Sequence, residues 1–217
     1  MDAFQALTTD LEFPNHFQEE NAVRTGGEFD ANRYFDILDH LSMETGYALD
    51  YVYQFDGMGG YPVLYARPLD APPLRTFAEY EQAAPGDYLE HVQADGTDEA
   101  FFQLTVLRVM GGQFYLYWHA GYFDHEVVAD GARLDALLQE TGEFCGEWQP
   151  QAQRQARALE LAPVVEALND RVAVTVVVFS KWRGFTSRTY TFAKTFPHQL
   201  LDSADEVLVE YECNVVF

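Results

Sequence analysis

Apolar and polar side chains alternate without a break along residues 47–55, and this alternation constrains the fold more than any other feature of the sequence. The large apolar side chains share one parity: Tyr47, Leu49, Tyr51, Tyr53 and Phe55. A period of two places them on one face of an extended chain, whereas a helix would scatter them around its surface. The pattern therefore predicts a β-strand with one buried face over 47–55.

The glycine-rich stretch DGMGG at 56–60 is either a turn or a phosphate-binding loop. A phosphate loop needs a helix directly after the glycines, so that backbone N–H groups face the anion, and it usually also carries a lysine. Here residues 61–66 are β-formers and no lysine follows. Asp-Gly between two extended runs is a hairpin signal. We therefore predict a hairpin whose second strand covers 61–66.

A second glycine pair, Gly111–Gly112, separates residues 100–110 from residues 113–119, and both segments are rich in β-forming side chains. We predict a second hairpin here. The stretches MGGYPVLY (58–65) and MGGQFYLY (110–117) match at five of eight positions. Two interpretations stay open: a weak internal repeat, or one turn chemistry used twice.

The remaining segments contain helical patterns and then a strand-rich C-terminal part. Capping residues and apolar spacing predict helices over 33–44, 76–83, 131–141 and 151–169. Three long β-forming runs follow: 172–182, 186–196 and 206–217. These elements predict an α+β fold of largely antiparallel hairpins and a C-terminal three-strand segment, with helices packed on one sheet face.

We expect one α+β domain over 1–217, in which residues 1–29 form an irregular N-terminal arm. A chain of this length buries roughly 70% of its unfolded surface on folding, so a single core is feasible. The alternative is a sub-domain boundary near 145–150, where the helical character gives way to strands. The C-terminal piece would be small, which favours one domain.

The chain is strongly acidic, with 35 Asp and Glu against 13 Lys and Arg and a net charge of −22. Such a surface repels nucleic acid and anionic membranes, and it attracts basic partners or cations. The alternative is that the acidity only keeps an aromatic-rich chain in solution. We therefore expect a basic protein partner and regard nucleic acid as disfavoured.

The absence of certain sequence patterns predicts where the protein is located and whether its two cysteines are reduced. The N-terminal residues show no signal-peptide pattern, and no run of 18 apolar residues occurs. Cys145 and Cys213 fit no metal-binding spacing. We expect both thiols to be reduced, and the protein to be cytoplasmic without a membrane partner.

Charge is segregated along the chain, because residues 171–201 contain no Asp or Glu. The basic residues of this stretch are Arg171, Lys181, Arg183, Arg188 and Lys194. A turn at Arg183–Gly184 would put three of them on one sheet face with Phe179, Tyr190 and Phe192, and would bring Trp182 and Phe185 together at its tip.

We predict a partner-binding surface on this hairpin, formed by Lys181, Trp182, Arg183, Phe185, Arg188 and Tyr190. Exposed Trp, Tyr and Arg commonly anchor interfaces. One alternative is that the basic residues pair with the protein's own acids while the aromatic rings pack in the core. Another is a platform for an anion or single-stranded nucleic acid, which the net charge opposes.

The stretch WHAGYFDHEVV at 118–128 is the densest cluster of metal-ligating side chains. His119, Asp124, His125 and Glu126 could hold a divalent metal ion or serve as acid and base. Their spacing matches no established motif, and a histidine on an aromatic face is more often a hydrogen-bonded core residue. This cluster is therefore the alternative site.

The sequence favours a non-enzymatic binding protein that engages a basic protein partner, in the manner of an inhibitor or immunity protein, without a cofactor. The alternative is a metal-dependent enzyme, or a small-ligand-binding protein, built on the cluster of His119, Asp124, His125 and Glu126. The prediction of a binding protein rests on the charge of the chain, and no catalytic motif supports the alternative of an enzyme.

Overall fold

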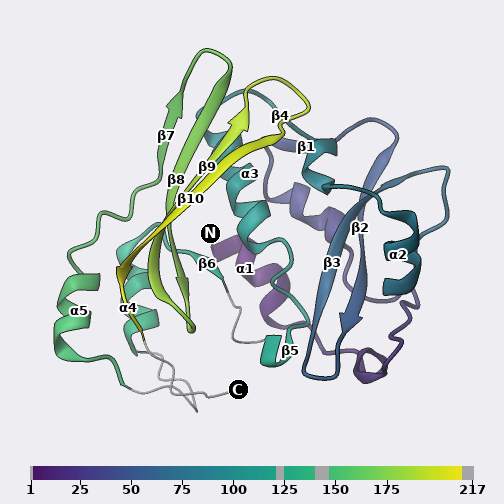
Figure 1. The fold of residues 1–217 in the computed structure, drawn as a ribbon, viewed down its shortest axis with the longest axis horizontal. Helices are drawn as coiled ribbons and strands as arrows, with labels where there is room; N and C mark the ends of the chain where they lie inside the picture. Colours follow the sequence, from purple (N-terminus) through teal and green to yellow (C-terminus); the bar gives the residue numbers. More distant parts are fainter. Residues whose placement is uncertain (1, 121–124, 140–146, 212–217) are drawn as a thin grey trace.

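The computed structural model describes residues 2–120, 125–139 and 147–211 (Figure 1). The α-helices are α1 (Asp2–Thr9), α2 (Phe77–Ala83), α3 (Asp98–Met110), α4 (Gly131–Gln139) and α5 (Pro150–Ala156). Short 3₁₀ helices are η1 (Asn15–Gln18), η2 (Ala31–Asp36) and η3 (Tyr88–His91). The strands are β1 (Leu41–Met43), β2 (Tyr47–Phe55), β3 (Gly59–Pro68), β4 (Val92–Ala94), β5 (Tyr117–Trp118), β6 (Glu126–Val127), β7 (Val164–Ala167), β8 (Arg171–Ser180), β9 (Gly184–Ala193) and β10 (Leu200–Val209).

The predicted α+β class is confirmed, and every strand pair among the described residues is antiparallel. One sheet has the order β10-β9-β8-β6, with β7 also paired to β8. A second sheet joins β2, β3 and β5, and a third joins β1 and β4. In Figure 1 the long C-terminal hairpins and the β2–β3 hairpin form two flanks, and α3 lies between them.

The first hairpin is confirmed. β2 pairs with β3 in one unbroken register from Tyr47↔Pro68 to Phe55↔Gly60. The Asp56 carboxylate accepts the N–H groups of Met58 and Gly59 at 2.9 and 2.8 Å and closes the turn. The glycines therefore form a turn between strands and not the phosphate loop that was the alternative.

The predicted second hairpin is wrong, because residues 98–110 form α3. Thr97 caps this helix by accepting the Ala100 N–H at 3.2 Å. Nine of its side chains are buried, and they lie on all sides of the helix. A helix that is apolar all round has no 3.6-residue periodicity, so its sequence resembles a buried strand. The MGG stretches accordingly lie in different structures: one in a hairpin, the other at a helix end.

Two other helix predictions are corrected, and two are confirmed. Residues 33–44 contain the 3₁₀ helix η2 and then β1, although Asp30 caps η2 as expected by accepting the Asn32 N–H at 3.0 Å. The segment 151–169 is helical only through α5 and becomes β7 after Pro163. The α2 and α4 helices lie where predicted within the described residues.

The N-terminal arm is more ordered than we expected. Residues 1–29 contain α1 and η1, and Phe4, Phe17 and Phe29 are buried in the main core. Glu28 ties the arm together: its carboxylate accepts the backbone N–H groups of Thr25 and Gly26, both at 2.7 Å.

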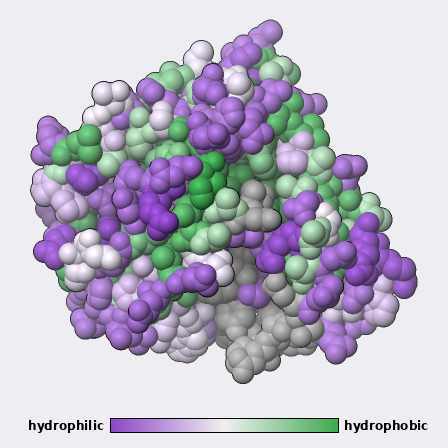
Figure 2. All heavy atoms as spheres, turned by 180° about the vertical axis from the view of Figure 1, so that it is seen from behind, coloured by the Kyte–Doolittle hydropathy of each residue, from purple (hydrophilic) through white to green (hydrophobic). Residues whose placement is uncertain are grey.

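Two hydrophobic clusters hold the molecule together. The larger one joins α1, α3 and the β2–β3 hairpin to one face of the C-terminal sheet through Val172, Val174, Val176 and Val178. The smaller one packs α4, α5 and Trp148 against the opposite face. Helices therefore cover one face as expected, and α4 and α5 add cover on the second. Seen from behind, hydrophobic atoms lie along the middle of the molecule between hydrophilic flanks (Figure 2).

Candidate functional site

The loop between β8 and β9 decides which side chains share a face. It has three residues, 181–183, with Ser180 opposite Gly184. The Arg183 N–H bonds to Ser180 O at 3.3 Å, and Gly184 follows at φ +75°, the left-handed position that such loops require. Our predicted two-residue turn would have paired residues of opposite parity. The observed register puts Phe179 on the other face from Arg188 and Tyr190.

Trp182 and Arg183 are the predicted partner-binding residues that lie exposed at the end of this hairpin. The Trp182 side chain is 44% exposed. Arg183 Nη1 lies 2.7 Å from Asp205 Oδ2 on β10, so part of the basic hairpin pairs with the protein's own acidic residues. The 181–183 loop therefore lies at the surface, next to the carboxylate of Asp205.

Phe185 and Tyr190 lie in the core and not on the predicted surface. Phe185 is fully buried, with its ring centroid 5.5 Å from that of Trp148. Tyr190 is 9% exposed and lies beneath the Arg108 guanidinium. Lys181 is half-buried on another cavity, and Arg188 is half-buried between the loop and Tyr190. The alternation within β9 could have indicated this burial, but the loop length fixes which parity faces inward.

The sequence did not mark β10 as a surface element. We predicted its strand over 206–217, whereas it begins at Leu200, and residues 212–217 lie outside the described part. Every residue from 201 to 207 is exposed. Because both faces of this part of the strand meet water, its side chains show no apolar alternation, and the pattern that reveals half-buried strands is missing.

The predicted metal cluster is not assembled among the described residues. The Glu126 carboxylate forms a bidentate ion pair with Arg133 of α4. His125 lies beside Arg188 and Arg183, and the His119 ring lies 4.4 Å from that of Trp118, tilted by 50°. Asp124, Cys145 and Cys213 lie outside the described residues. Within the described ranges, no group of three His, Cys, Asp or Glu side chains is arranged to hold a metal ion.

His125 occupies an unusual electrostatic environment. Burial and the positive charges of Arg188 and Arg183 lower the pKa of its imidazole to about 4. At neutral pH the ring is therefore uncharged, with one nitrogen able to donate and the other able to accept. His125 borders three cavities, of about 320, 370 and 550 Å³. Of the predicted cluster, Glu126 also lines the cavity of about 370 Å³, but its carboxylate is already paired with Arg133.

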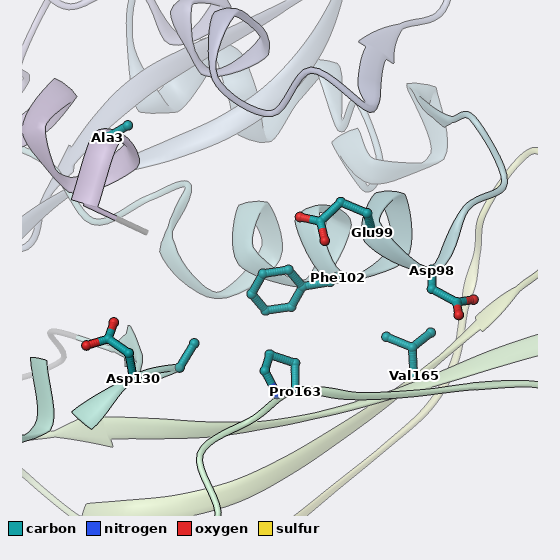
Figure 3. A pocket seen from close by; sticks show the side chains of 8 residues that line it. Ala3, Asp98, Glu99, Phe102, Asp130, Pro163 and Val165 are labelled. Atoms are coloured by element: carbon teal, nitrogen blue, oxygen red, sulfur yellow. The ribbon is translucent and has the colours of Figure 1, made fainter. Parts of the chain in front are cut away.

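A cavity of about 570 Å³ carries several carboxylates but has a structural explanation (Figure 3). Phe102 faces Pro163 across it, with Glu99 on the α3 side and Asp130 at the start of α4. Glu99 lies in the first turn of α3. Asp130 caps α4 by accepting the Ala132 and Arg133 N–H groups at 2.9 Å. Helix N-termini favour such carboxylates without any ligand.

The cavity of about 640 Å³ beside the N-terminal arm is lined by an internal ion-pair network. Asp50 of β2 accepts hydrogen bonds from Arg24 and from Arg67, the latter at 2.9 Å. The Arg24 guanidinium also lies 3.8 Å above the Tyr51 ring. Glu28 supplies a second carboxylate, 3.9 Å from Arg24 Nε, so two carboxylates balance the two guanidinium groups. This network fastens the arm to the β2–β3 hairpin, so its role is structural.

Comparison of the chain with protein-family models, with curated proteins and with solved structures found no match. Among the helices of the described residues, none is both long and apolar enough to cross a bilayer. The geometry of the site therefore carries the functional proposal.

Proposed function

We propose that this chain is a non-enzymatic acidic binding protein that engages a basic protein partner through the outer edge of β10 and the neighbouring 181–183 loop. The observation that carries the proposal is the run of seven exposed residues, 201–207, along a strand that ends the sheet. Among the described strands β10 pairs only with β9, so its outer backbone N–H and C=O groups face away from the sheet.

The chemistry of this edge fits an extended, positively charged segment. Asp202, Asp205 and Glu206 supply negative charge, while Leu201 and Val207 are 49% and 38% exposed and offer apolar contacts. When a strand is added to a sheet edge, main-chain hydrogen bonds supply affinity and the flanking side chains supply specificity. The net charge of −22 would also accelerate the approach of a cationic partner.

The 181–183 loop extends this surface beyond the strand. Trp182 and Arg183 are of the residue types that anchor interfaces, and the Arg183–Asp205 ion pair joins the loop to β10. Both partners in that pair are nearly half exposed, so a carboxylate or guanidinium of a partner can exchange with either of them.

The competing explanation is that the acidic side chains only protect the edge. Natural sheets place charges on edge strands to prevent pairing with other chains. Under that explanation, lysines protect the edge as carboxylates do, so reversing the charges has no specific effect on the binding of a partner. The two explanations therefore predict different results for the same variants.

The test uses peptides selected from a random displayed library for binding to the wild-type protein. Asp202→Lys combined with Glu206→Lys reverses the charge of the edge. Glu19→Lys combined with Glu20→Lys makes the same change in total charge at two exposed residues of the N-terminal arm. We expect the selected peptides to be basic, and to bind the edge variant at least about tenfold more weakly than the arm variant.

Amide chemical shifts on peptide addition then locate the contact. Perturbations along 200–209 and 181–183 support the proposal. Equal weakening by both double variants would mean that only net charge matters, and shifts elsewhere would place the site on another surface; either result rejects the proposal.

A further inference from the structure

A cavity of about 320 Å³ lies beside the β8–β9 loop, on the sheet face that carries Arg188 and Tyr190 of β9. His125 precedes β6, Ser180 ends β8, and Ser203 and Asp205 come from β10, so four strands bring polar groups to one place. Except for Tyr190, Ala204 and part of Trp182, the lining is polar or charged. The cavity is therefore built for a polar ligand group.

The charges in this cavity do not balance, because its lining contains two guanidinium groups and one carboxylate. In the sheet register Asp205 lies opposite Arg188. The Asp205 carboxylate instead pairs with Arg183 Nη1 at 2.7 Å. Arg188 Nε donates to the neutral Thr186 hydroxyl at 3.3 Å, and within the described residues no carboxylate pairs with Arg188. The cavity thus has a cationic excess in a chain that is otherwise strongly acidic.

The surroundings of Arg188 favour an anion further. The neutral imidazole of His125 can donate one hydrogen bond, and the hydroxyl of Ser203 is a second donor. The lowered pKa of His125 reports the same positive field, since its causes after burial are Arg188 and Arg183. A guanidinium with free donors in a cavity can form bidentate, charge-assisted hydrogen bonds to a carboxylate or a phosphate.

A second cavity, of about 550 Å³, lies beside the first, and His125, Arg188 and Tyr190 line both of them. Its walls include Tyr61 of β3 and Tyr88 of η3, together with the apolar side chains of β3. In this second cavity Arg108 is already paired with Asp87 at 3.3 Å. The first cavity therefore offers a cationic group that can bind an anion, and the second offers aromatic and apolar walls.

We propose that these adjacent cavities bind a small organic anion, with its carboxylate or phosphate group on Arg188 and an aromatic or apolar body along Tyr61 and Tyr88. This proposal shares the 181–183 loop and residues 203–205 of β10 with the proposed partner surface, but its anchor is Arg188 and its ligand is a small molecule, so small-molecule titration tests it separately. It gives His125 a role as a hydrogen-bonding ligand contact and not as a metal ligand.

The test is isothermal titration of the full chain with four probes. Phenyl phosphate and benzoate carry both the charged group and the ring, inorganic phosphate carries the charged group alone, and benzyl alcohol carries the ring alone. We expect one site for phenyl phosphate or benzoate, and weaker or undetectable binding of the two partial probes. Comparison of the phosphate with the carboxylate identifies the preferred anionic group.

Three variants separate a binding role from a structural one. Arg188→Gln removes the anchor and is expected to weaken binding about tenfold or more. Asp205→Asn removes the competing carboxylate and is expected to strengthen binding, a gain that a folding defect cannot produce. Arg171→Gln is the matched control, since Arg171 starts β8 at its far end and pairs with Asp170.

The proposal is overturned if none of the probes binds at millimolar concentration. It is also overturned if Arg188→Gln and Arg171→Gln bind equally well, or if Asp205→Asn weakens binding. Circular dichroism and chemical-shift spectra of each variant confirm that the sheet is intact, and the Asp205→Asn result stands even if Arg188→Gln fails to fold.

Discussion

Gly184→Ala tests how the β8–β9 loop fixes the geometry of both proposed surfaces. Gly184 has φ +75°, a conformation that costs an alanine roughly 1 kcal/mol. It is also crowded: a Cβ atom there would lie 2.2 Å from Val209 O and 2.7 Å from Tyr211 N. Both obstacles are backbone atoms at the end of β10, so no rotamer change relieves the contact.

The magnitude follows from adding the two costs. Overpacking against a fixed neighbour typically costs about 1–3 kcal/mol, so we expect Gly184→Ala to lower the free energy of unfolding by about 2–4 kcal/mol in total. Gly57→Ala is the matched control, because Gly57 has φ +83° but a Cβ added to it would meet no atom within 4 Å beyond its own chain neighbours. It carries the conformational cost alone.

The assay is urea denaturation of both variants and the wild type, followed by tryptophan fluorescence. We expect Gly184→Ala to be the less stable variant by at least about 1 kcal/mol, with chemical shifts changed along β10 and in the 181–183 loop. Equal stability of the two variants would show that β10 is not held against Gly184, and would refute the packing on which the edge and the cavity both depend.

Two further predictions concern charge. Burial opposes ionisation of Glu28, but hydrogen bonds from Thr25 and Gly26 outweigh it and lower the pKa of this carboxyl from 4.5 to about 2. After allowance for solvent screening, the carboxylate stabilises the fold by about 2 kcal/mol above pH 4.5, and this contribution is lost as the pH falls toward 2. Urea denaturation should show Glu28→Gln less stable than the exposed control Glu19→Gln at pH 7, with the difference shrinking below pH 4.5; a pH-independent difference would contradict this origin. Burial, Arg188 and Arg183 lower the pKa of His125 to about 4, so its NMR titration midpoint should lie near pH 4 and should rise in Arg188→Gln. A midpoint at or above 6.5, unchanged by that substitution, would contradict the placement of His125 beside the arginines.

The most regular parts of the fold were predictable because their pattern is local. Alternation over 47–55 identified β2, and Asp-Gly at 56–57 identified the turn, since both depend on neighbours in the chain. Asp130 identified the start of α4 for the same reason: its carboxylate accepts N–H groups two and three residues away.

The wrong predictions concern segments whose sequence shows no periodic pattern, and one hairpin whose register depends on the length of its loop. Nine of the thirteen residues of α3 are buried, so after its first turn the helix has no continuous polar face to reveal the helical period. β10 has the opposite problem, because residues 201–207 are exposed on both faces and show no apolar face. The prediction that Phe185 and Tyr190 lie on an exposed surface was wrong, because a three-residue loop, and not a two-residue turn, sets the register of β8 and β9.

Residue types and their neighbours along the chain were sufficient to establish the α+β class, the β2–β3 hairpin, the absence of Asp and Glu from 171–201 and the strong acidity of the rest. The pairing of Asp205 with Arg183, which leaves Arg188 facing a cavity with His125, became visible only in the folded chain. The reason is physical: these groups come from β9, β10, the 181–183 loop and the residue before β6, and which of them meet depends on strand register and packing.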